Sequence, residues 1–103
     1  MEVKWYLTLE LYELRILIFL LLHGPARKSD LVKALGLNWN TLSSNLNKLI
    51  DKGLVIKMVT FSGRPTYVYI ITSKGIKELE RIFLELKESL EKAKYEKPEP
   101  DIM

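Results

Sequence analysis

Residues 28–57 read KSDLVKALGLNWNTLSSNLNKLIDKGLVIK, and this stretch decides the fold. Leucine, valine and isoleucine recur in it at helical spacing, which predicts a short helix over 30–35 and a longer one over 39–52. Residues that favour helix ends flank both segments. They are the N-caps Ser29 and Asn38 and the closing glycines Gly36 and Gly53. The stretch therefore predicts two helices joined by a tight turn.

A hairpin and a long helix are predicted after this pair. Segments 54–61 and 66–71 are rich in Val, Ile, Tyr and Thr, and the turn sequence Ser-Gly-Arg-Pro at 62–65 separates them. Thr72 is expected to cap a last helix that extends to about Tyr95. Apolar residues spaced alternately by three and four positions form a heptad seam along it. The seam consists of Ile76, Leu79, Phe83, Leu86, Leu90 and Ala93.

A first helix is predicted over Thr8–His23, with Thr8 as its N-cap and His23-Gly24-Pro25 as its stop. Residues 16–22, ILIFLLL, are apolar on nearly every face. A membrane span needs about 20 such residues, so we expect a buried helix and no membrane. A helix that is apolar all round must be covered on all sides, and a partner chain is the natural cover for one of them.

Length and composition indicate one domain over residues 1–95, followed by a disordered tail over 96–103 that contains two prolines. The chain of 103 residues has no cysteine and one histidine, which excludes disulfides, zinc–thiolate sites and imidazole clusters. We therefore expect no metal and no cofactor. No carboxylate pair, nucleophile–base pair or phosphate loop stands at a meaningful spacing, so an enzyme is not expected.

The charges of the chain are segregated. Residues 24–78 hold nine basic and three acidic residues, a net of +6, whereas residues 1–23 and 79–103 have net charges of −1 and −2. A basic middle between acidic ends indicates that the middle of the chain meets a polyanion.

The predicted order is helix, short helix, tight turn, helix, hairpin, helix, which is a mainly α (α+β) fold. The second and third helices have a helix-turn-helix layout, and a hairpin with Arg64 at its tip would be a wing. Residues 28–57, with GRPTYVYIITSKGIKELE at 63–80, resemble the winged helix-turn-helix regulators of the MarR/ArsR/PadR-like superfamily, particularly its small archaeal members. The resemblance covers about residues 12–90 and implies a DNA-binding transcriptional regulator with long terminal dimerisation helices. The Asp-x-Arg wing motif of MarR proteins and the metal ligands of ArsR-type sensors have no counterpart here.

The segment 39–52 would be the recognition helix, lying in the DNA major groove. All four asparagines of the chain fall between residues 38 and 47, although asparagine is a mediocre helix former. Asparagine can form two hydrogen bonds with adenine, which favours base reading. The alternative is that these asparagines are solvent-exposed polar residues without a role in DNA binding. Trp39 falls near the buried side of the helix and is expected to pack in the core. The predicted base readers are Asn40, Thr41, Ser44, Asn45 and Asn47.

Contacts to the DNA backbone are expected from basic residues and from the N-terminus of the second helix, which can hold a phosphate. The predicted residues are Lys28, Ser29, Lys48, Lys57 and Arg64. The wing, residues 61–66, is expected on the minor groove or the backbone. Tyr67 and Tyr69 are expected to pack on the strands rather than stack on bases.

A homodimer with twofold symmetry would cover the terminal helices and set two recognition helices about one DNA turn apart. The predicted interface residues are Ile16, Phe19, Leu79, Phe83, Leu86 and Leu90. The alternative is a last helix that folds back on its own domain. The dimer interface could also hold a pocket for a small-molecule effector of unknown identity. The alternative is that its aromatic residues serve only for packing between the protomers.

The predicted function is a homodimeric, sequence-specific, double-stranded DNA-binding transcriptional regulator of the cytoplasm, with repression as its simplest mechanism. One alternative is an architectural DNA-binding protein of the same fold. Another is a protein-interaction module within a larger assembly that does not touch DNA. Binding to free DNA separates the last from the others, and the ratio of specific to random affinity separates the first two.

Overall fold

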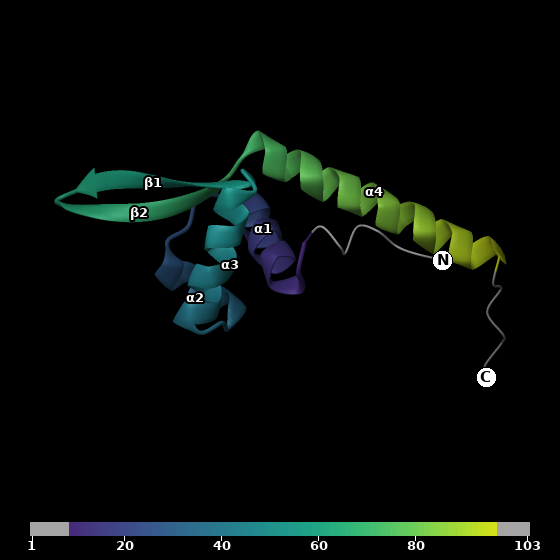
Figure 1. Cartoon of the computed structure of the whole chain (residues 1–103), viewed down its shortest axis with the longest axis horizontal. Helices are drawn as coiled ribbons and strands as arrows, with labels where there is room; N and C mark the ends of the chain where they lie inside the picture. Colours follow the sequence, from purple (N-terminus) through teal and green to yellow (C-terminus); the bar gives the residue numbers. More distant parts are fainter. Residues whose placement is uncertain (1–8, 97–103) are drawn as a thin grey trace.

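The computed structural model describes residues 9–96. It contains, in order, α1 (Leu11–His23), α2 (Lys28–Leu35), α3 (Trp39–Asp51), β1 (Val55–Ser62), β2 (Arg64–Ile71) and α4 (Ser73–Glu96). The first three helices form one group, from which the β1–β2 hairpin projects on one side and α4 on the other (Figure 1). The predicted mainly helical fold with a two-stranded hairpin is confirmed.

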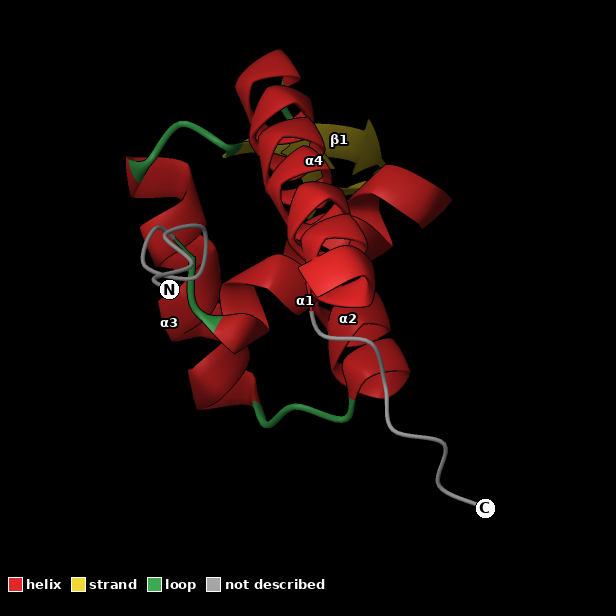
Figure 2. Ribbon diagram, turned by 90° about the vertical axis from the view of Figure 1, so that its right-hand side faces the viewer, coloured by secondary structure: helices red, strands yellow, loops and turns green. Residues whose placement is uncertain are grey.

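The core lies between α1, α2 and α3 and is closed by the base of the hairpin and the first turns of α4. Leucine and isoleucine at helical spacing supply most of it, because each helix turns one apolar stripe inward. Its fully buried apolar members are Ile16, Leu17, Leu20, Leu31, Leu42, Leu46, Leu49 and Val55. Among the described side chains of α4, Leu79 and Ile82 are the buried apolar ones, so the part of the helix after Ile82 extends beyond the core. Figure 2 shows this from the side toward which α4 extends, with α4 in front of α1 and the hairpin behind.

Several predicted helix ends are confirmed. The Asn38 side-chain oxygen accepts a hydrogen bond from the Thr41 backbone N–H at 2.8 Å, which caps α3. The Thr72 hydroxyl accepts one from the Gly75 N–H at 3.0 Å at the start of α4. Gly36 ends α2 with φ +67°, in the left-handed region that favours glycine.

Two other predicted ends are wrong. Ser29 does not cap α2, because the helix already begins at Lys28 and has Arg27 as its N-cap. The Asp30 carboxylate accepts a hydrogen bond from the Arg27 backbone N–H at 3.1 Å. This bond satisfies the backbone donor of the N-cap residue. Likewise α1 begins at Leu11 with Glu10 as N-cap, and the predicted cap at residue 8 lies outside the described residues.

The hairpin pairs in antiparallel register from Val55–Ile71 to Ser62–Arg64, with Gly63 at the tip at φ +86°. The strands therefore reach closer to the tip than the sequence predicted. Ala26, in the link between α1 and α2, exchanges two backbone hydrogen bonds of 2.8 and 3.1 Å with Tyr69. This bridge fastens the base of the hairpin to the start of α2. Tyr69 is buried as predicted, and burial raises the pKa of its phenol.

Two residues assigned to a dimer interface lie elsewhere. Ile16 is fully buried within the core of a single chain and is not available to a partner, whereas Leu79 is buried in that core and only borders the apolar surface between α1 and α4. The sequence shows that a helix face is apolar but not which neighbour covers it. Glu96 belongs to α4, so the predicted tail begins at least one residue too early, and residues 97–103 lie outside the described part. Within residues 9–96, no helix is long and apolar enough to cross a membrane.

Candidate nucleic-acid interface

Helix α3 turns its leucines into the core and a polar stripe outward. Asn40, Ser44 and Asn47 are exposed along this stripe, at spacings of four and three residues. Thr41 is half-buried beside them, and Lys48 is exposed at the same face. The stripe offers amides and hydroxyls, which are groups that can hydrogen-bond to the edges of DNA bases. Base reading by these residues stays a prediction.

Asn45 is not part of this stripe, and its assignment as a base reader is corrected. Its side chain is 5% exposed, and its amide donates to the Thr41 carbonyl at 2.8 Å. Its own carbonyl oxygen is buried and finds no hydrogen-bond partner among the described residues. The position borders the apolar stripe and is buried with it. Asn45 therefore cannot reach a base in this conformation.

Two acidic residues at the start of α1, the N-cap Glu10 and Glu13 in the first turn, tie that helix to α3. Glu13 is 0% exposed, and its carboxylate lies 2.8 and 3.1 Å from the ammonium of Lys52. The same carboxylate accepts the Glu10 backbone N–H at 2.9 Å. Glu10 in turn lies 3.2 Å from the Lys48 ammonium. Sequence reasoning missed both pairs, because their partners are 38 and 39 residues apart.

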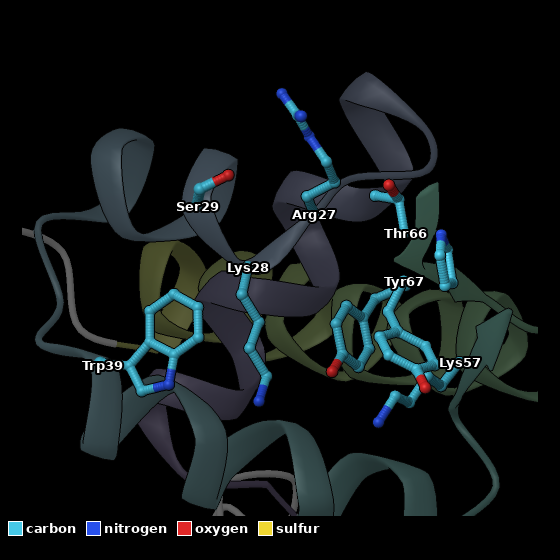
Figure 3. A pocket seen from close by; sticks show the side chains of 9 residues that line it. Arg27, Lys28, Ser29, Trp39, Lys57, Thr66 and Tyr67 are labelled. Carbon is cyan, nitrogen blue, oxygen red and sulfur yellow. The ribbon is translucent and has the colours of Figure 1, made fainter. Parts of the chain in front are cut away.

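A groove separates α3 from the hairpin and encloses about 450 Å³. It lies between the N-terminal turn of α2, the first residue of α3 and the hairpin (Figure 3). Its lining consists of Arg27, Lys28, Ser29, Trp39, Lys57, Pro65, Thr66, Tyr67 and Tyr69. Three of the predicted backbone contacts, Lys28, Ser29 and Lys57, are thus brought together in one place. Their binding to DNA stays a prediction.

Trp39 is 53% exposed, so the prediction that it packs in the core is wrong. A helical wheel places it near the apolar stripe, but the first turn of α3 borders the groove rather than another helix. Tyr67 is also half-exposed and faces the groove instead of being buried on the strands. Two aromatic rings therefore line a surface that also carries several cations.

Each ring supports a lysine. The Lys28 ammonium lies 5.3 Å from the centroid of the Trp39 ring, and the Lys57 ammonium lies 4.2 Å from that of Tyr67. In Figure 3 the Lys28 side chain extends between Trp39 and Tyr67. The negative face of an aromatic ring attracts a cation without cancelling its charge. The rings thus hold both ammonium groups at the groove.

The remaining cations near the groove differ from these two. Arg27 forms an ion pair with Asp30 at 3.3 Å, and this hydrogen bond holds the pKa of Asp30 below its ordinary value. Arg64 is exposed at the hairpin tip beside Gly63, where it was predicted to meet DNA. Phe61, across from Pro65 near the same tip, is largely exposed.

A family model described as winged helix-turn-helix matches residues 13–91. The chain belongs to the winged helix-turn-helix family. In this frame α2 and α3 are the helix-turn-helix, α3 is the recognition helix and the β1–β2 hairpin is the wing.

Solved structures agree with this assignment. A transcriptional regulator homologue from Pyrococcus horikoshii OT3 is 33% identical over 80% of this chain and 82% of its own, with a TM-score of 0.74. A transcriptional regulator from Thermotoga maritima is 22% identical, covers 95% of this chain and 71% of its own, and has a TM-score of 0.77. MarR from E. coli is 16% identical, covers 96% and 75%, and has a TM-score of 0.77. The fold is thus MarR-like. No curated protein matches the chain.

A second surface of this winged-helix chain is apolar and lies between α1 and α4. A groove of about 480 Å³ is lined there by Leu14, Ile18, Leu21, Ile76, Leu79, Glu80, Ile82, Phe83 and Leu86. Phe83 is 67% exposed, and Leu86 and Leu90 are also exposed on α4; their place in a dimer interface stays a prediction. Phe19 is half-buried, and its ring lies 4.4 Å from that of His23.

Proposed function

We propose that this chain is a homodimeric, sequence-specific regulator of transcription that binds double-stranded DNA in the cytoplasm. Membership of the winged helix-turn-helix family and the regulators among its structural neighbours support DNA binding. The same family and fold point to a regulator rather than an enzyme. The observation that carries sequence specificity is the stripe of Asn40, Ser44 and Asn47 on the exposed face of α3.

The division of charge on the surface supports base reading. Within the described α3, positive side chains come only from its last turn and C-cap. Lys48 and Lys52 there pair with Glu10 and Glu13 at the start of α1. Amides and a hydroxyl occupy the exposed stripe of Asn40, Ser44 and Asn47, while cations gather in the groove and at Arg64. Phosphate contacts position a protein on DNA, whereas contacts to base edges give it specificity. We assign the second role to α3 and the first to the groove and the wing.

Dimerisation is supported by the apolar surface of α1 and α4. Phe83, Leu86 and Leu90 follow one face of a helix that the described chain leaves uncovered beyond Ile82. A second copy related by a twofold axis would bury these side chains on both protomers. It would also present two recognition helices about one turn of DNA apart. Covering a promoter with such a dimer is the simplest route to repression.

The test of base reading is Asn40→Ala, measured by fluorescence anisotropy on a duplex selected from a random library and on its scrambled counterpart. We expect a loss of about 1–3 kcal/mol in binding free energy on the selected duplex and little change on the scrambled one. Ser89→Ala, a similar truncation on α4 away from α3, is the matched control and is expected to bind like the wild type.

The other outcomes identify the alternatives. An equal loss on both duplexes would contradict base reading by Asn40. Equal, salt-sensitive binding of the wild type to both duplexes would indicate an architectural protein. No binding at about 50 mM salt would leave a protein-interaction module as the function.

A further inference from the structure

The groove between α2, Trp39 and the wing has features that a simple phosphate patch does not need. It is concave, and a half-exposed aromatic ring stands on each of two sides, Trp39 on the α3 side and Tyr67 on the wing. A ligand that covers the exposed indole would remove apolar surface from water, which is favourable. Lys28 and Lys57 add two cations at the same place. The site therefore combines apolar and cationic recognition.

We propose that this groove is a cradle for one sugar–phosphate unit of the DNA backbone. The Trp39 indole packs against the apolar face of the deoxyribose, and Lys28 and Lys57 bind the adjoining phosphate oxygens. This inference rests on the proposed DNA binding and deepens it, since it adds Trp39 and Tyr67 to the residues that act on DNA.

The two lysines are preorganised for this role. Long, flexible lysine side chains lose rotamer freedom when they bind, and that loss reduces affinity. Here the faces of Trp39 and Tyr67 already restrict the ammonium groups, at 5.3 and 4.2 Å from the ring centroids. An aromatic face attracts an ammonium but leaves its N–H groups able to donate to a phosphate. Arg27 differs, because its guanidinium is engaged by the Asp30 carboxylate.

The position of the groove fits a backbone strand at the edge of the major groove. Trp39 directly precedes Asn40, the first residue of the polar stripe on α3. The opposite wall is the wing, and the backbone bridge between Ala26 and Tyr69 fastens the wing to the start of α2. A sugar–phosphate unit held between these walls would fix the depth and register of α3 on the bases.

Tryptophan fluorescence tests the cradle directly. The chain has two tryptophans, Trp5 and Trp39, so Trp5→Phe leaves Trp39 as the only source of tryptophan fluorescence. Acrylamide quenching of this variant is measured with and without a labelled duplex, whose binding is followed separately by anisotropy. We expect bound DNA to lower the quenching constant of Trp39 at least twofold. An unchanged constant on a duplex that anisotropy shows to be bound would overturn the cradle and leave the proposed function standing. Absence of binding at low salt would overturn both.

Charge substitutions give an independent measure. Lys28→Met and Lys57→Met are each expected to reduce the slope of log affinity against log salt by about 0.9, on selected and scrambled duplexes alike. Trp39→Ala is expected to weaken binding to both duplexes about five- to tenfold with an unchanged slope, because it removes apolar contact and no charge. Lys92→Met, an exposed lysine on α4, is the matched control with an unchanged slope. Slopes of the Lys28 and Lys57 variants equal to that of the control would contradict the proposal.

Discussion

The buried carboxylate of Glu13 leads to a prediction about how the recognition helix is held. Glu13→Gln keeps the size of the side chain but removes its charge. The wild-type carboxylate accepts hydrogen bonds from the Lys52 ammonium at 2.8 and 3.1 Å and from the Glu10 N–H at 2.9 Å. The glutamine retains one carbonyl oxygen for these donors, so the link between α1 and α3 weakens without leaving a cavity.

The expected magnitude follows from the exposure of the two partners. Breaking a fully buried ion pair costs about 3–5 kcal/mol, but that value applies only where both charges lack water. Glu13 is 0% exposed, whereas the Lys52 side chain is 41% exposed and can be rehydrated. Replacing charge-assisted hydrogen bonds by neutral ones should then cost about 2 kcal/mol. For a domain of this size, 2 kcal/mol lowers the melting temperature by about 8–16 °C.

The assay is thermal unfolding followed by circular dichroism, at one protein concentration because the proposed dimerisation would make the melting temperature concentration-dependent. Glu10→Gln is the matched control. The Glu10 carboxylate lies 3.2 Å from the Lys48 ammonium, but both side chains are exposed to solvent. Loss of this ion pair should therefore cost less than about 0.5 kcal/mol. Equal melting temperatures for the two variants would refute the reasoning that burial makes the Glu13 pair the stronger link.

Three further predictions concern dimerisation, packing and pH. Leu86→Lys, on the exposed apolar face of α4, should yield a folded monomer, and an unchanged dimer mass in light scattering would place the interface elsewhere. Gly75→Ala should lower the free energy of unfolding in urea by about 1–3 kcal/mol, because a Cβ there would collide with the Leu54 carbonyl; a loss below about 0.5 kcal/mol would contradict that close approach. The hydrogen bond from Arg27 lowers the pKa of Asp30 in the folded state. The small stability that it contributes is therefore present above about pH 4 and is lost as the pH falls further. The difference in melting temperature between wild type and Asp30→Asn should disappear below that pH. A difference that is the same above and below it would show that the Asp30 charge is not its cause.

The elements of the fold could be predicted because their signals are local. Asn38 and Thr72 cap the helices that follow them through hydrogen bonds within three residues, and Gly36 ends its helix by its own conformational freedom. The leucine spacing in α3 shows which face is buried, and the opposite face then contains Asn40 and Asn47. Within the candidate site, the exposed polar stripe of α3 could thus be predicted from the sequence.

The remaining features depend on neighbours that a helical wheel does not include. Asn45 and Trp39 both border the apolar stripe of α3, yet one is buried by adjacent helices and the other opens onto the groove. Ile16 belongs to a segment, residues 16–22, that is apolar on nearly every face, and only the fold shows that its own domain covers it. The pair of Glu13 and Lys52 joins positions 39 residues apart, which no local pattern predicts.

The most direct test of the account is the ratio of two affinities of the wild-type protein. Anisotropy titrations at about 50 and 200 mM salt compare a duplex selected from a random library with its scrambled counterpart. Base reading by α3 predicts that the selected duplex binds roughly 10³-fold or more tightly, with a preference that persists at the higher salt. Equal affinities for the two duplexes at both salt concentrations would contradict it.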